Sequence, residues 1–197
     1  SEMSVITNRG TFKADAVLIG AGARPDLSFL AGSAVAADSG ILVNDRMETS
    51  VPGIFAAGDA VRGPSAFCDL HVSHCLWPTA AEQGRIAGAN LAGAMLSYPG
   101  SLNMNVAEVY GLAVAAMGRS AADVGCDALI AGGEDRSGCL RIDLREGVPL
   151  GVTYAGPPEH TGCLGLLRPL VRWGRSLASC PETSRHVAGL AAILDRK

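Results

Sequence analysis

The chain has 197 residues, of which 48% are hydrophobic, 18% charged and 5% aromatic, and its formal net charge is −3. The apolar share excludes a disordered tail, and 16 Lys and Arg against 19 Asp and Glu leave no basic surface for nucleic acid. The longest apolar run, residues 106–117, contains Glu108 and is too short to span a bilayer. We therefore expect a folded, cytoplasmic protein that neither crosses a membrane nor binds nucleic acid.

Cysteine usage favours the same compartment. The six cysteines form no C-x-x-C pair, no secretory signal peptide begins the chain, and a chain of this length folds without disulfides. We expect free thiols in a reducing cytosol. The cysteines are Cys68, Cys75, Cys126, Cys139, Cys163 and Cys180.

The first hundred residues begin with a predicted hairpin, residues 4–7 and 11–13 around a turn at 8–10. Residues 15–19 are nearly all apolar, which predicts a parallel strand buried on both faces, and a glycine turn ending at Pro25 follows. A second strand pair is predicted at 41–43 and 54–57.

Residues 79–96 predict a helix with a face of small residues that permits close approach to a sheet or ligand. That face comprises Ala80, Ala81, Gln83, Gly84, Ile86, Ala87, Asn90 and Leu91. Tyr98-Pro99-Gly100 breaks the chain, so we place a domain boundary near residue 97, in an exposed linker. The expected domains are residues 1–97 and 98–197.

The second part predicts strands at 109–117, 128–131, 139–144 and 149–154, with a hairpin turn at 145–147. Helices are predicted at 164–173 and 187–194, where apolar residues recur every three or four positions. These elements indicate an antiparallel sheet with helices on one side, an α+β module.

One motif carries chemistry. Residues 49–59, T-S-V-P-G-I-F-A-A-G-D, match T-x-x-x-x-φ-φ-A-x-G-D, in which φ is apolar. The sequence here resembles the FAD-dependent pyridine nucleotide-disulfide oxidoreductases. The resemblance implies that Gly58 lets the backbone approach FAD, that Asp59 accepts a hydrogen bond from a ribityl hydroxyl, and that N–H groups from Ala60 onward face the pyrophosphate. The alternative is an ordinary surface β-turn.

Two further stretches extend the resemblance. Residues 15–25 are similar to the crossover that returns to the FAD domain in this family, which adds Gly22 to the cofactor-binding residues. Residues 77–84, W-P-T-A-A-E-Q-G, resemble the helix whose N-terminus points toward the flavin pyrimidine, where a positive helix end stabilises reduced flavin. This adds Trp77, Pro78, Thr79 and Ala80, although Thr79 also suits an ordinary N-cap.

The resemblance implies the fold and the function together. The expected fold is α/β: the C-terminal part of a Rossmann-like FAD-binding domain, then an α+β interface domain that residues 142–155 resemble. The branch is the NADH-dependent one of rubredoxin, nitrite and ferredoxin reductases and NADH oxidases, with FAD and NAD(P)H as cofactors. Electrons would pass from NADH through FAD to an acceptor. No catalytic residue is assigned.

The first FAD motif, G-x-G-x-x-G, and the NAD(P)H fingerprint are absent from these residues. We expect a C-terminal half, either cut from a longer enzyme or one part of a split one, and inactive alone. Its expected partners are the missing N-terminal half, a second copy in a homodimer and a small electron-transfer protein. The alternative function is a non-catalytic dimerisation or subunit-docking module.

Two clusters leave alternatives open. Residues 68–75 bring two Cys, two His and Asp69 together, which suits either a loop near the flavin or a metal site; we expect no metal, because ligands so close compete for one coordination sphere. Glu159, His160 and Cys163 are interpreted as a surface loop.

Two features of residues 164–175 have competing interpretations. Arg168, Arg172 and Arg175 follow helical spacing and predict a solvated face, or a dock for an acidic partner. The apolar stripe on the same segment is either the core face of the helix or a dimer interface. It consists of Leu166, Leu167, Leu170 and Trp173.

Overall fold

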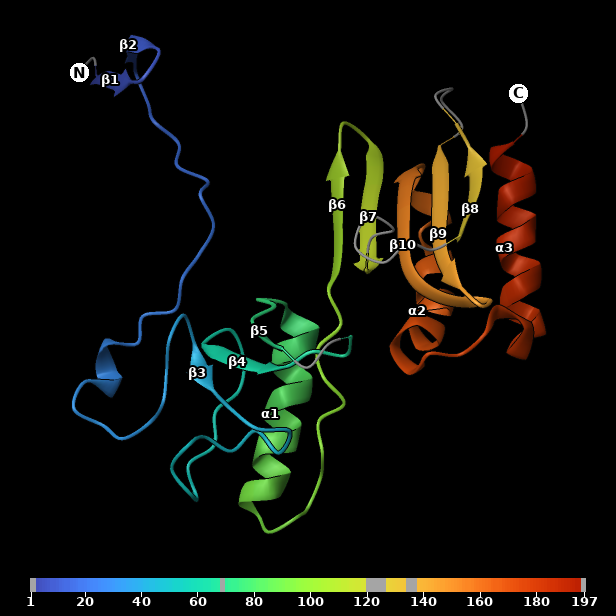
Figure 1. The fold of residues 1–197 in the computed structure, drawn as a ribbon. Helices are drawn as coiled ribbons and strands as arrows, with labels where there is room; N and C mark the ends of the chain where they lie inside the picture. Colours follow the sequence, from blue (N-terminus) through green and yellow to red (C-terminus); the bar gives the residue numbers. More distant parts are fainter. Residues whose placement is uncertain (1–2, 68–69, 120–126, 134–137, 196–197) are drawn as a thin grey trace.

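The computed structural model of the chain describes residues 3–67, 70–119, 127–133 and 138–195. Within these ranges the strands form three sheets, of two, three and five strands. Figure 1 shows an N-terminal hairpin, a small α/β unit around one helix, and a larger sheet covered by two helices.

The N-terminal hairpin is confirmed: β1 (Met3–Thr7) pairs antiparallel with β2 (Gly10–Ala14). The buried strand predicted at residues 15–19 is wrong. Those residues have no strand assignment, and Leu18 is fully exposed at 100%. A strand forms only where a neighbouring strand pairs with it, and a buried parallel strand also needs layers that cover both faces; no described strand pairs with this segment.

The small unit contains β3 (Ile41–Leu42), β4 (Val61–Pro64) and β5 (His71–Val72). Strand β4 pairs parallel with β3 and antiparallel with β5. A one-turn helix, η1 (Ser28–Leu30), precedes them.

The strand predicted at 54–57 is wrong, because the segment folds back on the loop before it instead of joining β3. The Thr49 N–H donates to the Ile54 carbonyl over 2.8 Å and the Ala56 N–H to the Met47 carbonyl over 3.0 Å. Only the isolated bridge between Glu48 and Phe55 is strand-like there. The strand that pairs with β3 is β4, which comes after the Gly58–Asp59 turn, whereas the predicted strand 54–57 comes before that turn.

Helix α1 (Trp77–Leu91) confirms the predicted helix, but it begins two residues earlier and ends five residues earlier than 79–96. Its buried side chains lie three or four residues apart and face the core around Met47 and Val61; they are Thr79, Gln83, Ala87 and Asn90. The predicted small-residue face is therefore wrong in part, since Ala81, Gly84 and Leu91 are exposed.

The side chain of Asn90 explains the early end of α1. Its Nδ2 donates to the carbonyls of Arg46 (2.9 Å) and Leu96 (2.8 Å), and its Oδ1 accepts the Leu96 N–H at 2.8 Å. These bonds turn the chain back toward the core just after the helix.

The segment predicted as an exposed linker is buried. Tyr98 is 2% exposed and packs in the core beneath α1, and Ser101 is 1% exposed. The Tyr98 N–H donates to the Asp45 carbonyl and the Ser101 N–H to the Pro64 carbonyl. At Gly100, φ is +89° and a Cβ would come within 2.4 Å of the Ser65 backbone. The predicted linker is therefore wrong, while the boundary near 97 stays a prediction.

The larger sheet is antiparallel throughout, in the order β6-β7-β10-β9-β8. Its strands are β6 (Met104–Val109), β7 (Leu112–Gly118), β8 (Asp127–Gly132), β9 (Cys139–Arg145) and β10 (Val148–Gly156). The predicted strand 109–117 is divided by a turn, because Tyr110 and Gly111 adopt φ values of 51° and 79°. The predicted turn at 145–147 is confirmed between β9 and β10.

Helices α2 (Gly162–Trp173) and α3 (Pro181–Leu194) cover one face of this sheet, and the short turns η3 (Pro158–His160) and η4 (Leu177–Ser179) precede them (Figure 1). Leu140, Ile142 and Tyr154 of the sheet and Leu167 of α2 are fully buried in the shared core. The α+β module is confirmed. Within the described ranges, every helix is too short or too polar to cross a bilayer.

Candidate functional site

The Gly58–Asp59 turn is tied to α1. The Gly58 N–H donates to Oε1 of Gln83 over 2.9 Å, and the Gly58 carbonyl accepts the Val61 N–H at 3.0 Å. Gly58 has φ +87°, a conformation that side-chain-bearing residues rarely adopt. Asp59 at the tip of the turn is exposed, and the Ala60 carbonyl accepts the Ile41 N–H, which joins the turn to β3.

The N-terminus of α1 lies against this turn, because a Cβ at Gly58 would sit 3.6 Å from the Ala80 Cβ. The N-cap residue is Leu76, and no side chain caps the helix. The N–H groups of a first helical turn have no acceptor within their own helix, and the helix dipole places positive charge there. Trp77 is the first residue of the helix and is 82% exposed, and Pro78 is the second.

Thr79 is therefore not the N-cap, and that alternative is wrong. It lies inside the first turn, 7% exposed, on the face of α1 that meets the core.

The loop leading into α1 runs past the same turn. Nε2 of His71 lies 2.9 Å from the Val43 carbonyl, and Sγ of Cys75 lies 4.0 Å from the Asp59 carbonyl. Nδ1 of His74 is buried without a hydrogen-bond partner, and burial lowers the pKa of His74 below 6.5. Cys68 and Asp69 lie outside the described residues, among which no group of three or more His, Cys, Asp or Glu side chains is placed to hold a metal.

A cavity of about 350 Å³ opens at the N-terminus of α1, between this helix, the start of β6 and α2. Its walls include Pro78, Thr79 and Glu82 of α1 and Arg168 and Arg172 of α2. The two domains expected from the sequence therefore both contribute to the space in front of the helix end.

The solvated arginine face predicted on α2 is wrong for Arg172, which is 9% exposed. Its Nη2 donates to both carboxylate oxygens of Glu82, at 3.0 and 2.9 Å. Arg168 and Arg175 are exposed, as the sequence predicts. The apolar stripe is divided too: Leu167 and Leu170 are core residues, whereas Leu166 and Trp173 are 40% and 59% exposed.

Most of the predicted cofactor-binding residues come together at one place. Gly58, Asp59 and Ala60 form the turn, and Trp77, Pro78, Thr79 and Ala80 form the first turn of α1. Gly22 is not brought to them: it lies in an exposed, irregular segment with no atom within 4 Å of an added Cβ. Sequence reasoning missed the roles of Gln83 and Arg172, because neither bond is visible in the spacing of one segment.

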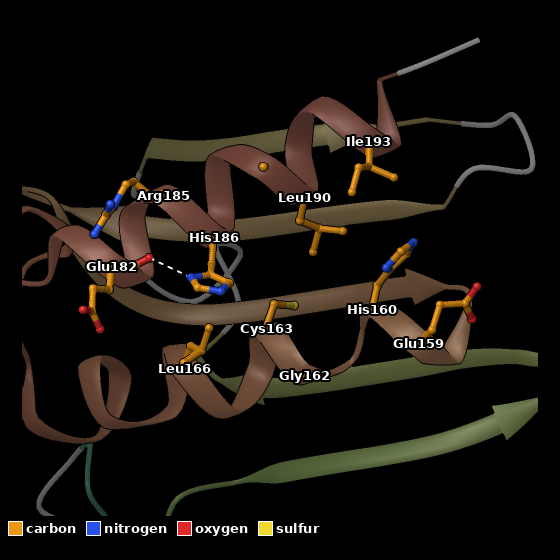
Figure 2. Close-up of a pocket in the computed structure, with 11 residues that line it drawn as sticks. Glu159, His160, Gly162, Cys163, Leu166, Glu182, Arg185, His186, Leu190 and Ile193 are labelled. Carbon is orange, nitrogen blue, oxygen red and sulfur yellow. Dashed lines mark hydrogen bonds between the residues drawn. The ribbon is translucent and has the colours of Figure 1, made fainter.

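A second hollow, a groove of about 960 Å³, lies between α2 and α3 (Figure 2). It is lined by Glu159, His160 and Cys163, but the predicted surface loop is wrong in part, because Cys163 belongs to α2 and is 9% exposed. Burial raises the pKa of the Cys163 thiol, which keeps it protonated and unreactive. In Figure 2 Nδ1 of His186 is bonded to the Glu182 carbonyl at 3.0 Å, within α3.

Comparison with known proteins agrees with the family resemblance that the motif indicates. The sequence model of the family "Pyridine nucleotide-disulphide oxidoreductase" matches residues 1–84, which include the Gly58–Asp59 turn and the start of α1. The resemblance to this family seen in the sequence is thus confirmed over residues 1–84. FAD and NAD(P)H are the cofactors of these enzymes.

Two curated relatives are each 32% identical to this chain. Subunit epsilon of the NADH-dependent phenylglyoxylate dehydrogenase of Aromatoleum evansii matches over 163 residues, 82% of the chain and 36% of the relative. The NADH-rubredoxin oxidoreductase of Clostridium acetobutylicum matches over 106 residues, 54% of the chain and 26% of the relative. The chain thus spans about a third or less of these relatives.

A solved structure shows the same fold. The FAD-dependent pyridine nucleotide-disulphide oxidoreductase of Desulfovibrio vulgaris superposes with a TM-score of 0.75 and 24% identity, over 96% of the chain and 50% of that protein. The predicted α/β fold, with its α+β module, is confirmed by this likeness.

The residues at the site fit FAD. The first turn of α1 has no side-chain cap, the glycine at 58 brings backbone against it, and the next residue, Asp59, is exposed. Free N–H donors at a helix N-terminus suit an anionic phosphate or a carbonyl that gains negative charge, and a carboxylate suits a hydroxyl donor.

Proposed function

We propose that this chain supplies one wall of the flavin site of an NAD(P)H-dependent oxidoreductase. The observation that carries the proposal is the hydrogen bond from the Gly58 N–H to Gln83, which holds the Gly58–Asp59 turn against the uncapped end of α1. The two stretches that resemble the family, residues 49–59 and 77–84, are thereby brought side by side and present one surface.

Each part of that surface has a role toward bound FAD. The Asp59 carboxylate accepts a hydrogen bond from a ribityl hydroxyl, and the N–H groups that follow it face the pyrophosphate. The N-terminus of α1, from Trp77 to Ala80, stabilises negative charge on the pyrimidine side of the flavin through its dipole. The chemistry that bound FAD supplies is acceptance of hydride from NAD(P)H and transfer of electrons onward.

The proposal includes partners. The first FAD motif and the NAD(P)H domain come from a further segment or subunit, as the short coverage of the relatives supports. A small electron-transfer protein is the proposed acceptor, a choice supported by the relative named for rubredoxin. We also propose that the protein works as a homodimer in the cytoplasm, through residues 98–197.

A second candidate function is a docking module within a larger complex. The face of the large sheet that turns away from α2 and α3 carries four apolar side chains that are 43–58% exposed, namely Val109, Leu112, Val114 and Ile130. An uncovered apolar face favours a protein contact. The match to a protein named as a subunit agrees with this use.

The test of the flavin proposal is Asp59→Ala in the protein assembled with the segment that supplies the first FAD motif. A hydrogen bond to a charged group contributes about 1.5–3 kcal/mol, so FAD should dissociate about 10- to 150-fold more readily. The measurement is flavin absorbance after dialysis, with Glu108→Ala, an exposed carboxylate on β6, as the control. Equal flavin retention in the native protein and in Asp59→Ala would refute the role of Asp59. An assembled native protein that takes up no FAD would favour the docking module.

A further inference from the structure

Helix α2 sends one charged side chain out of its own domain. Five of its residues are buried in the core of the large sheet, namely Cys163, Leu164, Leu167, Leu170 and Val171. The next residue, Arg172, reaches α1 and bonds both carboxylate oxygens of Glu82. The Arg172 side chain is 4% exposed and that of Glu82 27%, so the pair is largely screened from water.

Aromatic rings hold the guanidinium of Arg172 in place. It lies 5.8 Å from the ring centroid of Tyr98 and 5.8 Å from that of Trp173. Tyr98 belongs to the core beneath α1, and burial together with the nearby Glu82 raises its pKa. Arg172 therefore contacts the α/β core and the flavin-facing helix at once, while its backbone stays in α2.

Glu82, the partner of Arg172, lies next to Gln83 on α1. Glu82 and Gln83 are consecutive, so their side chains leave the helix about 100° apart. Gln83 holds the Gly58 turn on one side, and Glu82 holds Arg172 on the other. Two restraints in different directions fix the rotation of α1 about its axis. Both act on the turn that directly follows the uncapped N-terminus, and therefore fix the direction of its N–H groups.

We propose that Arg172 is a positioning residue of the flavin site: through Glu82 it sets the orientation of α1 and so the aim of its N-terminal N–H groups at the flavin. This assignment rests on the proposed function. It gives residues 98–197 a role in tuning the cofactor, apart from any contact with a partner. A cavity lies beside the Arg172–Glu82 pair and opens at Pro78 and Thr79, so the pair adjoins the first turn of α1.

The experiment compares Arg172→Gln, Arg172→Lys, Glu82→Gln and the double variant Arg172→Gln/Glu82→Gln in the assembled, FAD-loaded protein. Arg175→Gln, an exposed arginine just after α2, is the control. We expect about a tenfold weaker FAD affinity and a more negative flavin midpoint potential in each neutral variant, because the helix end no longer stabilises reduced flavin. The double variant should lose no more than either single variant, and Arg172→Lys should recover part of the loss.

Several outcomes separate the possibilities. A merely structural pair would lower the melting temperature of the apoprotein while affinity and potential stay at their native values, and this result overturns the proposal. Should Arg172→Gln fail to fold, Glu82→Gln decides by the same two measurements, because Glu82 is partly exposed. If the native protein binds no FAD, the proposed function fails. If it binds FAD and the variants bind equally well at the same potential, only the role of Arg172 fails.

Discussion

Replacing Gln83 with Met tests the joint between the motif turn and α1. Gln83 is 3% exposed, and its Oε1 is the acceptor, at 2.9 Å, of the half-buried Gly58 N–H. Methionine keeps the length of the side chain and its packing but removes that acceptor. Leaving a buried donor without a partner costs about 1–3 kcal/mol of the free energy of unfolding. For a chain of this size, each kcal/mol lowers the melting temperature by about 2–4 °C.

The assay is unfolding by denaturant and by heat, followed by circular dichroism. Arg85→Met, at an exposed position on the same helix, is the matched control and should stay within about 0.5 kcal/mol of the native chain. If Gln83→Met is as stable as the control, the bond does not hold the turn. The reasoning from this turn to the flavin site would then lose its basis.

Two further predictions concern pH. Burial lowers the pKa of His74, so the unfolded chain takes up a proton first as the pH falls below 6.5, and the protein loses stability there. His74→Gln should flatten this loss of stability between pH 7.5 and 5.5 in denaturant titrations. An unchanged dependence of stability on pH in this variant would contradict the prediction. Burial raises the pKa of Tyr154 to about 12, so the unfolded chain ionises first above pH 10 and stability falls with rising pH. Tyr154→Phe should remove part of that alkaline loss while costing about 1 kcal/mol at pH 7, because the bond from its hydroxyl to the Pro157 carbonyl (2.8 Å) is lost; equal alkaline slopes would count against it.

Four of the five strands of the large sheet could be predicted from the sequence, because their signals are local, whereas β6 was not predicted. Burial alternates along β9 from Cys139 to Ile142, and a turn follows at Glu146 and Gly147; both are set by neighbouring residues and agree with the prediction, although Asp143 is buried as well. The same holds for α2 and α3, whose apolar spacing is helical. The site motif was readable for a related reason: glycine at a positive φ and an exposed Asp59 in one turn have a short sequence signature.

The predictions were wrong where hydrogen bonds and contacts between distant segments determine the local structure. Residues 54–57 are apolar enough for a strand, but their backbone groups bond the loop at Met47 and Thr49. The Pro-Gly pair after Tyr98 suggests a linker, yet the Tyr98 ring and the backbone of Ser101 are buried against the first unit. Arg172 follows a solvated helical spacing, and only the position of α1 shows that its charge is paired. Spacing within one segment carries no information about such partners.

The buried segment from Tyr98 to Leu102 connects the two halves of the chain through packing and not through an exposed linker. An exposed linker would let residues 98–197 fold and function separately, but Tyr98 packs beneath α1 while Leu102, three residues after Pro99, packs in the core of the large sheet. Cutting there would expose both side chains and separate Arg172 from Glu82. Removing the partner of a buried charge costs several kcal/mol, reduced here because Glu82 is partly exposed. Helix α1 is thus held by three segments at once: the Gly58 turn, the Tyr98 segment and α2. A change in the C-terminal domain that moves α2 therefore reaches the first turn of α1 without any contact to the cofactor.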